Sequence, residues 1–337
     1  MGSAPLVSAI TPCYNGENYL AVYLTSMLQQ TYPNIQLVIV DDGSTDRTYE
    51  VAKSFEIPMR NRGVDYHIIC NEHGGQARAI NSGLQLVTGK YLIWPDSDDV
   101  LEKTSIEKRV ELLESNPQYG FVRSNGAFFD FETGKDLARL SNSEDCKRDD
   151  IFMDLILEKT YCACGCYMVR MEVLKSIYPN MHIMESEAGQ NWQLLIPIAG
   201  KTKCGYIDED LYRIAVREGS HSRRKRNLED EIIRYNRLKE VLEEGIRLAE
   251  RSDADYKRIV DCKYDRILFG LFIRYKEFER AKAQYNLLKE KKECSNEERS
   301  LYIKTFHPFY YQFRYFVYRI LRRFKRYINY GKYQRSN

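Results

Sequence analysis

The first hundred residues alternate between short runs that favour strands and longer segments with helical spacing of apolar side chains. The strand-favouring runs are Leu6–Thr11, Gln36–Val40, Tyr66–Cys70 and Tyr91–Trp94. The helical segments are Glu17–Gln30, a segment capped by Ser44 or Thr45 that continues to Phe55, and Gln76–Leu86. This alternation predicts an α/β fold in which a parallel sheet carries helices on both faces.

Polar residues stand directly after each predicted strand. They are Tyr14 and Asn15, Asp41 and Asp42, Asn71, and the run from Asp96 to Asp99. Because ligands of open α/β sheets lie outside the carboxyl ends of the strands, we expect these side chains to line one crevice. Several carboxylates at one sheet edge are costly unless a cation or a ligand binds there.

The run Asp96-Ser97-Asp98-Asp99 is a candidate metal site. Two carboxylates two residues apart at a strand end can reach one divalent cation, and oxygen ligands suit Mg²⁺ or Mn²⁺. Such a cation would bridge the phosphates of a nucleotide. The alternative is that Asp98 or Asp99 caps a helix over Lys103–Leu113.

Four motifs, in this order, carry a resemblance to a known family. They read PCYNGE at 12–17, VIVDDGSTD at 38–46, NEHGGQARAINSGL at 71–84 and GKYLIWPDSDD at 89–99. The chain resembles glycosyltransferase family 2, strongly over residues 5–100 and weakly to residue 222. The resemblance implies a GT-A fold, the Rossmann-like fold of nucleotide-diphospho-sugar transferases, and inverting transfer from a nucleotide sugar.

The resemblance also implies a role for each matching residue. The residues expected at the base and ribose of the donor are Pro12, Tyr14 and Glu17. Those expected at the diphosphate and the donor sugar are Asn71, Arg78 and Asn81. Asp42 would accept a hydrogen bond from the uracil N3–H, which cytosine lacks. Asp96 would reach the ribose or the metal, and Asp98 would be the main ligand of Mn²⁺ or Mg²⁺.

Glycosyl transfer needs a base for the acceptor hydroxyl, and an Asp or Glu is the usual choice. The family commonly supplies it from a Glu-Asp pair, but the corresponding residues here are Gln190 and Asn191, and amides cannot act as bases. Three interpretations stay open. Glu187 or Glu185 supplies the carboxylate, Asp99 supplies it, or the site binds a nucleotide sugar without catalysis.

The segment from Leu211 to Ser222 resembles the loop that closes over the donor phosphates in this family. Its His221 would complete the metal site or hydrogen-bond the diphosphate, or it is an ordinary exposed histidine. We place the domain boundary after this segment, with a GT-A domain over 1–222 and a helical region over 223–337. The helices expected in that region are Asn227–Arg251, Asp255–Tyr275 and Phe278–Lys292.

The end of the chain is strongly basic. Residues 304–337 contain nine Lys or Arg and no Asp or Glu, and since the whole chain carries +3, the rest carries −6. On a helical wheel the tail's Phe residues fall opposite its Arg residues. That pattern is typical of a helix at an anionic membrane surface, and also of a helix whose apolar face packs on its own domain. The acidic body argues against nucleic acid as a partner.

No run of about 18 apolar residues and no signal peptide is visible, and nine Cys without disulfide-like spacing favour a reducing compartment. We therefore expect a cytoplasmic protein, either free or at the inner face of the cell membrane. The expected function is metal-dependent transfer from a UDP-sugar to a glycan or lipid-linked acceptor in surface polysaccharide synthesis. The alternatives are a catalytically impaired nucleotide-sugar-binding protein and a membrane-peripheral scaffold.

Overall fold

The computed structural model describes residues 4–217, 226–251 and 254–312. Its contacts divide the chain into two compact units, Met1–Val260 and Asp261–Asn337. No helix among the described residues is long and apolar enough to span a bilayer. The first unit carries the sheet, and with it the described residues that the sequence analysis places in the site.

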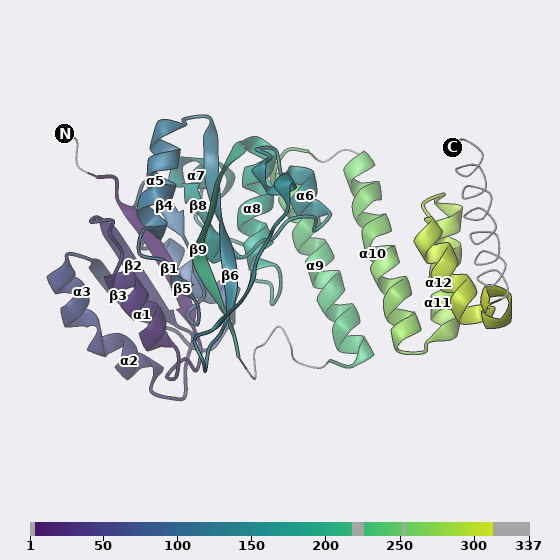
Figure 1. Cartoon of the computed structure of the whole chain (residues 1–337), viewed down its shortest axis with the longest axis horizontal. Helices are drawn as coiled ribbons and strands as arrows, with labels where there is room; N and C mark the ends of the chain where they lie inside the picture. The colour runs from purple at the N-terminus through teal and green to yellow at the C-terminus, as the bar shows by residue number, and fades with distance from the viewer. Residues whose placement is uncertain (1–3, 218–225, 252–253, 313–337) are drawn as a thin grey trace, which may run out of the picture. The chain divides into compact units, whose positions relative to one another are not determined.

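Nine strands of the described residues form one sheet in the order β3-β2-β1-β4-β8-β6-β9-β5, with β7 paired to β6 (Figure 1). The strands are β1 Val7–Cys13, β2 Ile35–Asp41, β3 Asp65–Cys70, β4 Tyr91–Ile93, β5 Val100–Leu101, β6 Tyr119–Asp130, β7 Asp136–Arg139, β8 Tyr167–Arg170 and β9 Lys203–Val216. Strands β1 to β4 are parallel, and Val7 lies opposite both Ile35 and Tyr91. Strand β8 is antiparallel to β4 and β6, whereas β9 is parallel to β6. The sheet is therefore mixed.

The parallel half of this sheet confirms the four predicted strands. Every residue of β1 and β2 is buried, as expected for central strands that helices cover on both faces. The helices that connect these strands and lead out of β5 are α1 Leu20–Leu28, α2 Thr48–Ser54, α3 Glu56–Arg62, α4 Gln76–Leu84 and α5 Ser105–Ser115. From β1 to β3 each new strand is added on the same side of the sheet, whereas β4 lies on the other side of β1. Right-handed crossovers therefore put α1, α2 and α3 on one face of the sheet and α4 on the other.

One expected helix start is wrong. Neither Ser44 nor Thr45 caps a helix, because α2 begins only at Thr48 and has no side-chain cap at its N-terminus. The Ser44 hydroxyl instead accepts the backbone N–H of Asn15 at 2.9 Å. A contact between two loops far apart in sequence has therefore replaced the local cap.

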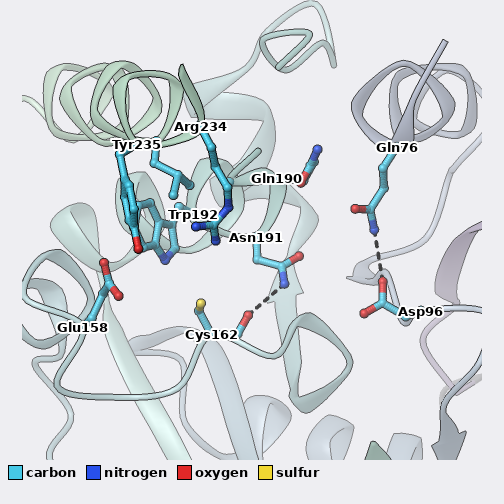
Figure 2. A pocket seen from close by; sticks show the side chains of 11 residues that line it. Gln76, Asp96, Glu158, Cys162, Gln190, Asn191, Trp192, Arg234 and Tyr235 are labelled. Carbon is cyan, nitrogen blue, oxygen red and sulfur yellow. Dashed lines mark hydrogen bonds between the residues drawn. The ribbon is translucent and has the colours of Figure 1, made fainter. Parts of the chain in front are cut away.

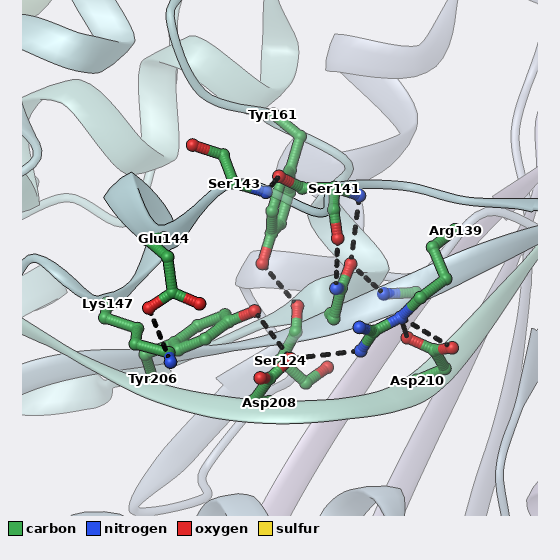
Figure 3. Close-up of polar contacts among 12 residues, drawn as sticks. Ser124, Arg139, Ser141, Ser143, Glu144, Lys147, Tyr161, Tyr206, Asp208 and Asp210 are labelled. Atoms are coloured by element: carbon green, nitrogen blue, oxygen red, sulfur yellow. Dashed lines mark hydrogen bonds and ion pairs between the residues drawn. The ribbon is translucent and has the colours of Figure 1, made fainter.

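Two long strands bring the chain back to the carboxyl edge of the sheet. Strands β6 and β9 pair over most of their length, and Arg213 of β9 lies opposite Val100 of β5. A polar network, shown in Figure 3, ties β7 and β9 together: Arg139 forms ion pairs with Asp208 at 3.0 Å and Asp210 at 2.8 Å. Strand β9 is therefore held by β6 on one edge and by β5 on the other.

The first unit continues beyond the expected boundary at residue 222. Its remaining helices are α6 Phe152–Ile156, α7 Met171–Ile177, α8 Gln190–Lys201 and α9 Leu228–Leu248. Helix α9 lies close against α8: a Cβ at Gly200 would lie 2.4 Å from the Cβ of Ala249, and one at Gly245 would lie 3.1 Å from Ile196. Because this packing joins α9 to the sheet-bearing unit, the chain divides at Val260 instead.

The second unit is helical, as expected. Helix α10 Ala254–Arg274 crosses the division, and α11 Phe278–Glu290 and α12 Asn296–Phe306 follow. A capping box of Ser295 and Glu298 starts α12, and the rings of Tyr285 and Tyr302 stack at 4.0 Å. Residues 313–337 lie outside the described residues, so the amphipathic character of the basic tail stays a prediction.

Candidate active site

The loops after β1 and β2 are bound to each other by backbone and side-chain contacts. Asn15, whose φ is +49°, accepts the N–H of Thr45 at 2.9 Å with its side-chain oxygen. The N–H groups of Gly16 and Glu17 donate to Thr48 at 2.7 Å and to Asp46 at 3.1 Å. The first two sequence motifs are therefore joined by hydrogen bonds at the carboxyl edge of the sheet.

The residues expected at the nucleotide base differ in how accessible they are. Pro12 is buried within β1. The Glu17 carboxylate accepts hydrogen bonds from the backbone N–H of Arg47 at 3.2 Å and from its side chain at 3.3 Å. Tyr14 is 37% exposed, and one face of its ring stacks on His73 at 4.1 Å. Of these three residues, Tyr14 offers the clearest surface for a planar base.

Asp42 holds the loop between β3 and α4. Its side-chain oxygens accept the N–H groups of Gly74 at 3.0 Å and Gly75 at 2.8 Å, and the ring of His73 lies 2.9 Å away. The residue is only 3% exposed. A Cβ at Gly43, whose φ is +73°, would lie 2.5 Å from the backbone nitrogen of His73, so this approach requires glycine. A hydrogen bond from uracil to Asp42 would add to these contacts and stays a prediction.

Among the three residues expected at the diphosphate and donor sugar, Arg78 is the accessible one. Its side chain is exposed and lies against Gly74, where a Cβ would come within 2.3 Å of its Cδ. Asn71 is partly buried and donates to the Ser82 hydroxyl at 2.9 Å. Asn81 is 5% exposed, and its amide donates to the Ile183 carbonyl and accepts the Ile183 N–H, so its contact with the donor stays a prediction.

The acidic run lies between α4 and β9. Asp96 accepts a hydrogen bond from the Gln76 amide at 3.0 Å, and its own N–H donates to the Tyr212 hydroxyl at 3.1 Å. Asp99 is 5% exposed and accepts the N–H of Ala215 at 2.8 Å. The alternative that Asp98 or Asp99 caps the following helix is wrong, since α5 begins at Ser105 after Thr104.

Asp98 has a cationic partner. Arg217, which directly follows β9, bonds one oxygen of Asp98 through two nitrogens at 2.9 and 2.8 Å. The same guanidinium lies 4.2 Å from the ring centre of Tyr19. The resemblance predicted that Arg217 belongs to the segment that closes over the donor, but no sequence pattern indicated its pairing with Asp98, the expected main metal ligand.

The three carboxylates are electrostatically crowded. Burial, and then the charge of Asp98, raise the pKa of Asp96 to about 7. Burial also raises the pKa of Asp99, and the charges of Asp96 and Asp98 raise it further. A divalent cation would relieve this repulsion, because it favours the ionised form of each carboxylate.

The acidic run fits a site for Mg²⁺ or Mn²⁺ in which the protein would supply only some of the ligands. Asp96 and Asp98 offer the oxygen ligands that such ions prefer. No group of three His, Cys, Asp or Glu side chains among the described residues converges on one ion position. Mg²⁺ is commonly held by one or two carboxylates together with phosphate and water. His221, the expected second ligand, lies outside the described residues.

Two of the three residues predicted as the base, Glu185 and Glu187, lie just before α8, whereas Asp99 belongs to the acidic run after β4. Glu187 forms an ion pair with Arg237 of α9, and Glu185 lies 3.9 Å from His182. The amides that replace the expected Glu-Asp pair have contacts of their own: Gln190 donates to the Ser186 carbonyl and Asn191 to the Cys162 carbonyl, both at 2.9 Å. Because an ionised carboxylate cannot donate a hydrogen bond, this local structure is built for amides.

A pocket of about 380 Å³ opens between the acidic run and α9 (Figure 2). Its lining residues are Gln76, Asp96, Glu158, Cys162, Gly189, Gln190, Asn191, Trp192, Arg234, Tyr235 and Leu238. Neither Glu185 nor Glu187 is among them. Sequence reasoning missed the contribution of α9 and of Glu158, because no motif marks these residues and only the fold brings them to Asp96.

A sequence model described as Glycosyl transferase family 2 matches residues 8–178, just over half of the chain. The Rickettsia prowazekii protein described as uncharacterized glycosyltransferase RP339 is 39% identical over 110 residues, which are 33% of this chain and 32% of the relative. Glycosyltransferase GlyG of Streptococcus pneumoniae is 33% identical over 139 residues, or 39% of this chain and 45% of GlyG. The chain thus matches less than half the length of either relative.

Two solved structures share the fold. The crystal structure of S. aureus TarS in complex with UDP-GlcNAc matches with a TM-score of 0.61 and 18% identity, over 85% of this chain and 81% of that chain. Mannosyltransferase PcManGT from Pyrobaculum calidifontis, in complex with GDP-Man and Mn²⁺, matches with a TM-score of 0.53 and 15% identity, over 90% and 81%. These likenesses confirm a GT-A fold with a helical C-terminal region.

Proposed function

The chain belongs to glycosyltransferase family 2, and we propose that it transfers a sugar with inversion from a UDP-sugar to a glycan or lipid-linked acceptor during surface polysaccharide synthesis. One observation carries the proposal. The four motifs meet at the carboxyl edge of the parallel strands: Tyr14 stacks on His73, Asp42 bonds the loop that leads into α4, and Gln76 of α4 bonds Asp96, which lines a pocket. This is where α/β sheets bind their ligands.

The choice of UDP rests on the fold neighbours and on Asp42. TarS is described with UDP-GlcNAc and with UDP. Asp42 would accept the N3–H of uracil, while Tyr14 would contact the base through its exposed ring. Arg78, which is exposed beside the loop that Asp42 holds, would bind the diphosphate, because a guanidinium can bond two phosphate oxygens at once.

Asp98 and Asp96 would hold a divalent cation, and His221 would serve as a further ligand. PcManGT, which shares the fold, is described with Mn²⁺. When bound, the ion would supply positive charge to the leaving diphosphate. Since Arg217 bonds Asp98 in the described structure, that guanidinium would have to share Asp98 or give it up when the ion binds.

An inverting transfer requires a base that takes the proton of the acceptor hydroxyl as it attacks the anomeric carbon. Glu187 or Glu185 remains the proposed base, since both lie in the loop that leads into α8 and the pocket. Glu158 is a further candidate, because among the described residues it is the Glu that lines the pocket. Conversion of each to Gln, with turnover measured under donor saturation, identifies the base as the variant with the largest loss.

Two other functions have support of their own. The amide contacts of Gln190 and Asn191 favour a protein that binds a nucleotide sugar without transferring it. The basic tail, with Phe309 86% exposed near its start, favours peripheral contact with an anionic membrane, as in a scaffold. Flotation with anionic and with neutral vesicles, for the whole chain and for a chain lacking 304–337, tests the membrane contact apart from activity.

The experiment that tests the proposal is a screen of nucleotide sugars with and without Mn²⁺. We expect one UDP-sugar to raise the melting temperature in the presence of Mn²⁺, since a ligand of the native state stabilises it, and to release UDP slowly. Asp98→Asn should abolish both effects, whereas Asp149→Asn, which changes an exposed partner of Lys203, should retain them. Wild-type UDP release by Asp98→Asn would contradict the metal assignment, and the absence of binding by every nucleotide sugar would contradict the function.

A further inference from the structure

Two parts of the pocket in Figure 2 lie outside the family match: the start of α8, from Gly189 to Trp192, and α9. Gln76 and Asp96 form the side that belongs to the donor site, while Arg234, Tyr235 and Leu238 come from α9. The family match ends at residue 178, and α9 begins at Leu228. The part of the pocket farthest from the donor motifs is therefore specific to the C-terminal half of this chain.

Helix α9 is firmly fixed where it borders the pocket. Gly189, at the start of α8 with a φ of +75°, lies so close to α9 that a Cβ would come within 2.9 Å of Val241. Leu238 is 9% exposed, and Arg237 forms an ion pair with Glu187 of the loop before α8. Side chains on this stretch of α9 are thus presented from a rigid element, as a specific binding site requires.

The lining combines the groups that bind carbohydrate. Tyr235 supplies an aromatic ring that can lie against the apolar face of a sugar, and Trp192, which is 6% exposed, adds a small apolar surface. The amides of Gln76, Gln190 and Asn191 can bond hydroxyl groups. Several of these groups already have partners within the protein, so they offer their remaining hydrogen-bonding capacity. A sugar acceptor fits this lining better than an apolar ligand does.

Arg234 is the one cation among the lining residues. Figure 2 shows its side chain reaching from α9 into the pocket on the side of Asn191. Its guanidinium lies 5.2 Å from the ring centre of Tyr235, and the carboxylate with which it pairs, Glu231 on the same helix, is 3.8 Å away. That distance exceeds a hydrogen bond, so Arg234 keeps donors for a ligand. The acidic lining residues, Asp96 and Glu158, lie on opposite sides of it in this view.

We propose that this pocket binds the acceptor, and that the acceptor carries an anionic group, a phosphate or a carboxylate, which Arg234 binds. The inference rests on the proposed function, since it assigns the second substrate of the same reaction. Arg234 would form charge-assisted hydrogen bonds with two oxygens of that group, while Tyr235 and Trp192 contact the adjoining sugar ring. In this arrangement α9, and not the family motifs, selects the acceptor.

The test compares three ligands that share one sugar ring: glucose 6-phosphate, glucuronate and glucose. Each is titrated into protein saturated with UDP, which keeps anions out of the donor site, and binding is followed by ligand-observed NMR. We expect at least one charged sugar to bind about tenfold more tightly than glucose, in line with the strength of charge-assisted hydrogen bonds. The ranking of the phosphate and the carboxylate identifies which anion the site prefers.

Arg234→Gln should remove the preference for the charged sugar without changing the affinity for UDP. Arg247→Gln is the matched control, because Arg247 lies on the same helix and pairs with Glu244 away from the pocket. The proposal is overturned if the wild-type protein binds no sugar, if it binds all three equally, or if Arg234→Gln keeps the preference. Failure of the protein to bind UDP itself would instead count against the proposed function.

Discussion

At the scale of single residues, Gln190 and Asn191 show how a departure from a family motif can be built into the structure. Both amides donate to backbone carbonyls, of Ser186 and Cys162 respectively. A carboxylate in either place would put negative charge beside a carbonyl oxygen and lose the donated hydrogen bond. We therefore do not expect a single replacement, of Gln190 by Glu or of Asn191 by Asp, to create a working base.

We predict that Asn191→Asp destabilises the protein by about 1 kcal/mol, because it removes a part-buried hydrogen bond and places a carboxylate beside the Cys162 carbonyl. Urea denaturation at neutral pH measures this change, and Asn142→Asp at an exposed position provides the control. If Asn191→Asp were as stable as the wild type, the contact with Cys162 would not be a significant part of the fold.

A second prediction at this scale concerns the pKa of Asp96, which burial and Asp98 raise to about 7. In the absence of a divalent cation, the native protein keeps a proton on Asp96 that the unfolded chain releases above about pH 4. The native state thus binds more protons than the unfolded state, so the free energy of unfolding should fall as pH rises from about 4 to about 7.

Denaturation in the presence of a chelator, at several pH values across this interval, measures this effect for the wild type and Asp96→Asn. The variant should show a shallower fall, because its side chain does not titrate. Parallel curves for the two proteins would show that Asp96 ionises at its ordinary pKa.

At the scale of elements, the sequence predicted what is local and missed what is long-range. The four parallel strands and helices α9, α10 and α11 lie close to their expected bounds, because buried strands and amphipathic helices each have a clear periodicity. The expected cap at Ser44 failed, since that hydroxyl bonds Asn15, which precedes it by 29 residues. The pairing of Arg217 with Asp98 spans 119 residues and has no sequence pattern.

The packing of α9 on α8 leads to a prediction at this scale. Leu242 of α9 is fully buried, whereas Ile233 of the same helix is 49% exposed. Leu242→Ala should lower the free energy of unfolding by about 2–5 kcal/mol, as a cavity in a core does, and Ile233→Ala should change it much less. Equal effects of the two substitutions would mean that α9 is not part of the folded core.

At the scale of the whole molecule, the family motifs supply only Gln76 and Asp96 to the pocket, and its other lining residues come from later parts of the sequence. The motifs of the first hundred residues predicted the fold and the donor edge of the sheet. The pocket could not be predicted, because its wall depends on where α9 packs after the chain leaves β9. The charge asymmetry, with −6 on the body and +9 on 304–337, is a property of the sequence that the described residues do not test.

We expect a nucleotide sugar to bind where the loops after β1, β2, β3 and β4 meet. Hydrogen–deuterium exchange of the whole chain, with and without UDP and Mn²⁺, tests it most directly, because a bound ligand slows the exchange of the amides it covers and orders. With ligand bound, exchange should slow in residues 13–17, 41–46, 71–78 and 94–99 and should change little in α11 and α12. Unchanged exchange in all four loops, or protection confined to the second unit, would contradict it.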